Sequence, residues 1–303
     1  MFEKGLLAAK RILITGGGSG LGAAMARRFA ELGAELAICG RRPDVLEATA
    51  NAIRASFASP VHAFPCDIRD SAAVEAMMKT IWQDGPLDIL VNNAAATFIA
   101  QTEQLSFRAA DAILGPTLHG AMYCTLAAGK LWIEAGHKGV VLSILSTSTI
   151  TGRAFTVPSA MAKSAVLAMT KSLAVEWGPK GVRLVAIAPG AFPTAGATGQ
   201  LRPQGRDSNW AARNPLGRSG RASGARRSRE LPDLGGGRLH QWRNGSAGWR
   251  RAFALLWRGG PPGLDGGAMG GPASGACEGP GVAWRGPAQS LPNQSFTLYP
   301  SCL

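Results

Sequence analysis

Short apolar runs alternate with longer amphipathic segments along residues 1–217. The runs, such as RILIT and VRLVAI, are rich in Ile, Leu and Val, which is typical of strands buried on both faces. Strands are expected at Arg11–Thr15, Glu35–Cys39, Val61–Pro65, Asp88–Val91, Gly139–Leu145 and Val182–Ile187. Helices are expected at Leu21–Leu32, at Pro43–Ala55, from a cap at Asp70 or Ser71 to Trp82, over most of Phe107–Ala135, and at Ser159–Trp177. This alternation predicts an α/β fold: a doubly wound parallel sheet with helices on both faces.

The pattern changes near residue 217. Residues 218–303 hold 18 Gly and 8 Pro, no Ile and a single Val. Such a composition predicts an irregular or disordered segment. Our preferred hypothesis is a reading-frame shift that replaced the native C-terminus, and a native disordered basic tail is the alternative. We therefore expect a folded domain at 1–217 and a low-order, Arg/Gly/Pro-rich tail at 218–303.

The net charge of +13 is divided between these two parts. The tail has 11 Arg, no Lys and 4 acidic residues, a charge of +7, which leaves +6 for residues 1–217. A mildly basic domain fits an anionic cofactor and substrate. Nucleic-acid binding by the Arg- and Trp-containing tail is an alternative, but the base composition of a GC-rich gene explains the tail equally well, so no nucleic acid is expected.

Targeting and metal signals are weak. No apolar run reaches the roughly 18 residues of a membrane helix, so no membrane association is expected. The first residues do not resemble a secretory signal, and a cytoplasmic location is expected. The five cysteines show neither a CxxC pair nor a metal-binding spacing, so we expect free thiols and no metal.

A glycine-rich segment, TGGGSGLG, joins the first strand to the first helix. Glycines there allow a tight turn and a close approach to a pyrophosphate, whose negative charge faces the helix N-terminus. An ordinary turn is the alternative, but the position between a strand and a helix favours a dinucleotide. The candidate cofactor-binding residues of this segment are Thr15, Gly16, Ser19, Gly20, Leu21 and Gly22.

The adenosine end of the expected cofactor site falls after the second and third strands. Arg41 and Arg42 stand where NAD-binding proteins have an acidic residue for the ribose hydroxyls. Guanidinium groups pair well with a 2′-phosphate, so NADP(H) is favoured over NAD(H). Asp67 and the following Ile68 are candidates for contact with adenine, and a helix cap or turn is the alternative for Asp67.

Several motifs in their order resemble the short-chain dehydrogenase/reductase family. They are TGGGSGLG, Asn92-Asn93-Ala94-Ala95, Lys163 in the long helix and Pro189-Gly190 after the sixth strand. The resemblance covers about residues 1–217 and implies hydride transfer with a nicotinamide cofactor. It adds Asn93, Ala94, Ala95, Lys163, Pro189, Gly190 and Thr194 as cofactor-binding candidates. Homo-oligomers are expected from the family, although the family's last helix and strand are not recognisable here.

The family's Tyr-x-x-x-Lys motif reads Ser159-Ala160-Met161-Ala162-Lys163 in this chain. Loss of the tyrosine removes the usual proton donor for carbonyl reduction. One branch, the 2,4-dienoyl-CoA reductases, lacks this tyrosine, and the residues around Lys163 look very like that branch. The resemblance implies NADPH-dependent reduction of an acyl-CoA thioester with two conjugated double bonds, as in fatty-acid β-oxidation.

The catalytic candidates follow from that resemblance. Lys163 would hold the nicotinamide ribose, Ser159 would support the nicotinamide end, and Ser148 and His119 would donate hydrogen bonds to the thioester oxygen. Ser148 replaces a tyrosine of that branch and His119 an asparagine, so a purely structural role is the alternative for each. The rival functions are another enoyl-CoA or carbonyl reductase of the same fold and a catalytically impaired nucleotide-binding scaffold.

Overall fold

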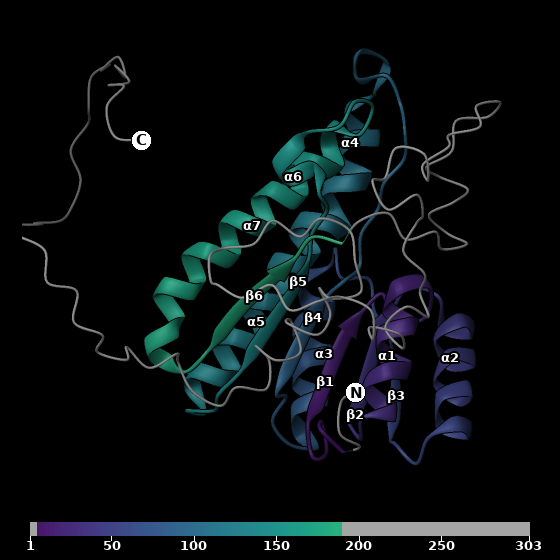
Figure 1. The fold of residues 1–303 in the computed structure, drawn as a ribbon, viewed down its shortest axis with the longest axis vertical. Helices are drawn as coiled ribbons and strands as arrows, with labels where there is room; N and C mark the ends of the chain where they lie inside the picture. The colour runs from purple at the N-terminus through teal and green to yellow at the C-terminus, as the bar shows by residue number, and fades with distance from the viewer. Residues whose placement is uncertain (1–4, 190–303) are drawn as a thin grey trace, which may run out of the picture. The chain divides into compact units, whose positions relative to one another are not determined.

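A computed structural model describes residues 5–189 of the 303-residue chain. The tail at 218–303 lies outside the described residues, as do two cofactor candidates, Gly190 and Thr194. The strands are β1 (Arg11–Thr15), β2 (Glu35–Gly40), β3 (Val61–Pro65), β4 (Ile89–Asn92), β5 (Val140–Ile144) and β6 (Arg183–Ile187). They form one parallel sheet in the order β3-β2-β1-β4-β5-β6 (Figure 1). The predicted doubly wound sheet is therefore confirmed.

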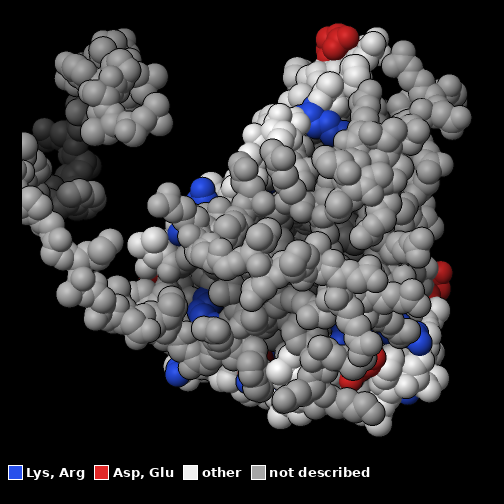
Figure 2. All heavy atoms as spheres, in the orientation of Figure 1, with Lys and Arg blue, Asp and Glu red and all other residues white. Residues whose placement is uncertain are grey.

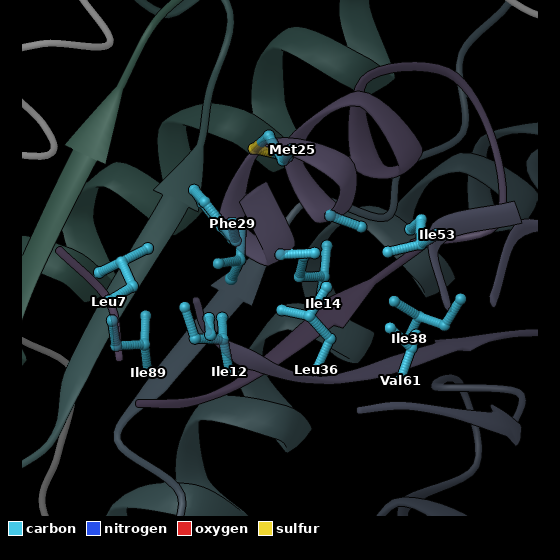
Figure 3. Packing of buried hydrophobic residues seen from close by; sticks show 14 of the residues in the cluster. Leu7, Ile12, Ile14, Met25, Phe29, Leu36, Ile38, Ile53, Val61 and Ile89 are labelled. Atoms are coloured by element: carbon cyan, nitrogen blue, oxygen red, sulfur yellow. The ribbon is translucent and has the colours of Figure 1, made fainter. Parts of the chain in front are cut away.

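Both faces of the sheet are covered by helices. The main helices are α1 (Gly20–Glu31), α2 (Pro43–Ser56), α3 (Ser71–Gln83), α4 (Phe107–Leu114), α5 (Gly120–Glu134), α6 (Ser148–Thr151) and α7 (Val157–Trp177). Successive residues of β1 face opposite sides, as a strand buried on both faces requires. Ile12 and Ile14 pack with Phe29 of α1 in one cluster, which Figure 3 shows, whereas Leu13 packs in the other cluster with Trp132 of α5.

The long helical segment 107–134 contains a π-helical turn, η2 (Gly115–His119), between α4 and α5. Pro116 has no backbone N–H to donate and its ring crowds the preceding turn, so a regular α-helical ladder cannot pass through it. The wider turn accommodates the proline. Such turns are often found at functional sites. The prediction of a mostly helical segment is confirmed, but its interruption was not predicted.

Some expected boundaries are corrected by the structure. The long helix α7 begins at Val157 rather than Ser159, because Pro158 fits the first turn of a helix. The short helix α6 was not predicted. Of the two candidate caps of α3, Asp70 is the one used: its carboxylate accepts hydrogen bonds from the backbone N–H groups of Ala72 and Ala73.

Charged side chains of the described residues are spread over the surface. Figure 2 shows lysine and arginine at several separate places on the visible face, with acidic side chains among them. No helix within residues 5–189 is long and apolar enough to span a membrane.

Candidate functional site

The strand order reverses between β1 and β4, and the carboxyl ends of these two strands are hydrogen-bonded to each other. Thr15 at the end of β1 is buried, and its hydroxyl accepts hydrogen bonds from the backbone N–H groups of Asn93 and Ala94, both at 3.0 Å. The Asn93 amide donates back to the Thr15 carbonyl at 2.9 Å. In doubly wound sheets the ligand binds outside the strand ends at such a reversal. Three of the predicted residues thus meet at the expected place.

The glycine-rich loop lies against this junction. Gly16 and Gly20 have positive φ, at 66° and 55°, which side-chain-bearing residues rarely adopt. Gly22 has no room for a side chain, since a Cβ there would lie 2.2 Å from the Gly16 carbonyl oxygen and 2.7 Å from the Asn93 amide nitrogen. The loop ends at Ser19, the N-cap of α1, whose side chain makes no capping bond. The first-turn N–H groups of α1 thus lie after the carboxyl end of β1 with no side-chain acceptor from Ser19, the arrangement that suits a pyrophosphate.

The residues predicted to bind the adenosine part of the cofactor follow the ends of β2 and β3. Arg41 and Arg42 follow β2, are exposed, and form no ion pair with any residue in the described range. Asp67 follows β3 and is ion-paired with Arg69 at 2.5 Å. Hydrogen bonds from Arg69, with a smaller contribution from the charge of Arg41, hold the pKa of Asp67 below its usual value. The neighbouring Ile68 is buried.

Lys163 lies on the buried face of α7. Its side chain is 7% exposed, and its ammonium group donates a hydrogen bond of 2.5 Å to the Ile144 carbonyl at the end of β5. Burial lowers its pKa to about 8, so the lysine is still mostly protonated at neutral pH. Ser159 lies one helical turn before it and is half-buried. The ammonium is thus held at the carboxyl end of β5, the same edge of the parallel sheet at which Thr15 and Asn93 meet.

Ser148 begins α6, the short helix between β5 and α7. It is 8% exposed, and its hydroxyl donates a hydrogen bond of 3.0 Å to the Ser146 hydroxyl. α6 packs against α7, the helix that carries Lys163. The hydroxyl groups of Ser146 and Ser148 therefore lie together at the start of the helix that packs against α7.

His119 is the last residue of the π-helical turn and is exposed. Its ring stacks on Tyr123, with the ring centroids 6.2 Å apart. Sequence reasoning missed the residue that fixes this turn, Thr117. The Thr117 hydroxyl accepts from the Ala96 N–H at 3.0 Å and donates to the Ala96 carbonyl at 3.3 Å. The neighbouring Gly115 and Pro116 indicate an irregular helix in the sequence. No sequence pattern indicates that Thr117 contacts the loop that contains Ala96.

The remaining predicted residues add little to the site. Pro189 is the last described residue, so the segment that would contact the pyrophosphate beyond it is not described. Cys39, Cys66 and Cys124 are free and buried, as expected. Burial raises the pKa of each of these three thiols, that of Cys124 to about 12, so they are poor nucleophiles at neutral pH.

Three features together define a dinucleotide-binding α/β protein. They are the strand order, the glycine loop with no room for a side chain at Gly22, and the helix N-terminus at the point where the strand order reverses. The short chain dehydrogenase family profile matches residues 10–204. The chain belongs to this short-chain dehydrogenase/reductase family of oxidoreductases, which use a nicotinamide cofactor.

Individual relatives agree with this assignment. An uncharacterized oxidoreductase of Caenorhabditis elegans is 45% identical over 201 residues, which cover 65% of this chain and 64% of that protein. A Bacillus subtilis protein named a probable 2,4-dienoyl-CoA reductase is 41% identical over 194 residues, 63% of this chain and 76% of that protein. The crystal structure of a short chain dehydrogenase from Bacillus anthracis superposes with a TM-score of 0.63 at 39% identity, over 70% of this chain and 84% of that one.

Proposed function

We propose that this chain reduces 2,4-dienoyl-CoA thioesters with NADPH, a reaction of fatty-acid β-oxidation. The observation that carries the proposal is Ser159 one helical turn before the buried Lys163, in the position of the family's phenol. The only tyrosine within residues 5–189 is Tyr123, which stacks on His119. The relative with a dienoyl-CoA reductase name adds support.

The reaction explains why a phenol is dispensable. Bound NADPH would supply a hydride to the far carbon of the conjugated system. The electron pair moves through the two double bonds to the thioester oxygen, and the resulting dienolate then takes up a proton from water on carbon. The site therefore needs hydrogen-bond donors for an oxyanion and no strong acid beside the oxygen.

This chain's residues divide those roles. The Lys163 ammonium, fixed on the Ile144 carbonyl, supplies positive charge and hydrogen bonds for the nicotinamide ribose hydroxyls. The ring N–H of His119 and the hydroxyl of Ser148, once it turns away from Ser146, are the candidate donors to the thioester oxygen. Thr15 and Asn93 hold the strand ends between which the cofactor would lie.

The preference for NADPH rests on Arg41 and Arg42. Both guanidinium groups are exposed at the adenosine end, free to pair with a 2′-phosphate. A charged hydrogen bond contributes about 1.5–3 kcal/mol, so either Arg→Ala variant is expected to weaken NADPH binding about 10- to 100-fold. NADH binding should change little, because NADH has no 2′-phosphate. Calorimetric titration with both cofactors measures the difference, and equal losses for the two cofactors would contradict the assignment.

The test of the reaction is NADPH oxidation, followed by absorbance, with the full chain and a 2,4-dienoyl-CoA, a 2-enoyl-CoA and a simple ketone in parallel. Turnover of the dienoyl thioester alone is expected. Lys163→Met should abolish it, and Lys171→Met, an exposed lysine on the same helix, is the matched control. Preference for another substrate would indicate a different reductase. NADPH binding without turnover would indicate a nucleotide-binding scaffold.

Ser148 gives a second test. A serine hydroxyl reaches less far than a phenol, so the Ser148→Tyr variant is expected to raise kcat with the dienoyl thioester. Ser148→Ala removes the hydroxyl, and unchanged activity in that variant would remove Ser148 from the list of oxyanion donors.

A further inference from the structure

The π-helical turn that ends at His119 is in close contact with the loop after β3. The contact at its C-terminal end joins Gly120 and Ile68. A Cβ at Gly120 would lie 2.5 Å from both Cδ1 and Cγ1 of Ile68. Ile68 is only 6% exposed, so its side chain has little room to move away. The position of Ile68 therefore limits where the turn can end.

The other end of the turn is in contact with the next residue of the same loop. A Cβ at Gly115 would lie 3.1 Å from Cδ and 3.4 Å from Cγ of Arg69. Two consecutive loop residues, Ile68 and Arg69, thus lie against the glycines at the two ends of the turn. Between them, Thr117 bonds the turn to the backbone of Ala96.

The guanidinium group of Arg69 is hydrogen-bonded to the carboxylate of Asp67, the residue expected to bind adenine. Asp67 accepts four hydrogen bonds from Arg69: from the backbone N–H at 3.1 Å, from Nε at 2.9 and 3.0 Å, and from Nη2 at 2.5 Å. A carboxylate offers about four lone-pair sites. An adenine amino group that binds Asp67 must therefore displace part of Arg69, and the stem of Arg69 lies on Gly115.

We propose that Ile68 and Arg69 are positioning residues for His119, so that adenosine binding at Asp67 sets the position of the π-helical turn and of the histidine at its end. The coupling follows a continuous path of contacts, from Asp67 through Arg69 and Ile68 to the two glycines. A π-helical turn lacks the regular α-helical ladder, which makes it the place in the helix where a small displacement can be absorbed. The proposal rests on the nicotinamide dinucleotide site and not on the identity of the substrate.

The experiment uses the full chain and adenosine 2′,5′-bisphosphate, a probe that fills the adenosine end and has no nicotinamide. The chain has four histidines, and the ring resonance of His119 in an NMR spectrum is assigned with His119→Gln. At saturation with the probe we expect the His119 resonance to shift. That of His137, which lies 3.7 Å from Asp88 at the opposite end of β4, should stay unchanged.

Two variants separate coupling through the contacts from a direct effect of the probe. Ile68→Ala removes both atoms that lie against Gly120, and is expected to abolish most of the probe-induced shift of His119 at saturation. Ile81→Ala truncates an equally buried isoleucine of the same core cluster, on α3, and should retain the shift. A shift that persists in Ile68→Ala would show that the contact between Ile68 and Gly120 does not carry the coupling, and would overturn the proposal.

The remaining outcomes are also decisive. Binding of the probe in calorimetry with no shift of His119 refutes the coupling. If the bisphosphate does not bind, 5′-AMP is titrated instead. Failure of both probes to bind would refute the adenosine site at Asp67, on which the coupling depends. A chain that shows the shift but does not turn over a dienoyl thioester would contradict the proposed reaction and leave the coupling supported.

Discussion

Replacing the buried lysine should make the protein more stable and inactive at the same time. In the folded chain the pKa of Lys163 falls from the usual 10.5 to about 8, because burial disfavours the ammonium form. Each pKa unit corresponds to about 1.4 kcal/mol, so holding the charge in place at neutral pH costs about 3 kcal/mol. Lys163→Met removes that cost and leaves the buried Ile144 carbonyl without its donor, a loss of about 1–3 kcal/mol. The variant should therefore be up to about 2 kcal/mol more stable at pH 7.

The same reasoning fixes the pH dependence. Below pH 8 the lysine is protonated in both states, and the full cost is present. Between pH 8 and 10.5 the unfolded chain keeps the proton that the folded chain has released, so the stability of the natural protein rises with pH over this window. The advantage of Lys163→Met should accordingly disappear by about pH 10.

Urea unfolding of both proteins at pH 7 and pH 10 measures this change. Other groups titrate over the same range, but they are common to both proteins and cancel in the difference. Lys171→Met, which removes an exposed lysine of α7, should show no such pH dependence. A stability difference between Lys163→Met and the natural protein that is the same at both pH values would refute the argument from burial.

The other predictions concern the strand ends. Thr15→Val should lower the free energy of unfolding by about 1–3 kcal/mol in urea, because two partly buried N–H groups lose their acceptor at about 0.5–1.5 kcal/mol each; Thr15→Ser, which keeps the hydroxyl, should lose much less. Gly22→Ala should weaken NADPH binding, since its Cβ would lie 2.2 Å from a carbonyl oxygen of the loop and would force the loop to move. Gly40→Ala, whose Cβ would meet nothing closer than 3.7 Å, is the control, and equal binding by the two variants would contradict the close approach.

The parts of the fold that the sequence predicted are those that local pattern decides. The alternation of Ile12, Leu13 and Ile14 across a strand, and the position of a glycine loop between a strand and a helix, depend on neighbours along the chain. The placement of Lys163 on the buried face of its helix follows from the motif that contains it. The strands and the order of the elements were therefore predictable.

Contacts between distant segments were not predictable in the same way. That Thr117 would bond to Ala96, or that Arg69 would occupy Asp67 and lie on Gly115, depends on which loops meet after the sheet has formed. Lys163 donates to a backbone carbonyl at the end of β5. Every residue has such a carbonyl, so the type of residue at that position does not indicate the contact. The sequence therefore named candidate residues but not the contacts that hold them together.

The bonds between Thr15 and Asn93 also have a consequence for the order of folding. They join residues 78 positions apart, and closing so long a loop costs chain entropy before any contact offsets it. Each half of the sheet can form from nearer pairings, while the junction between β1 and β4 forms only when both halves are present. Substitutions at the junction are thus expected to speed unfolding more than they slow folding. We therefore expect the junction that would hold the nucleotide to form late in folding.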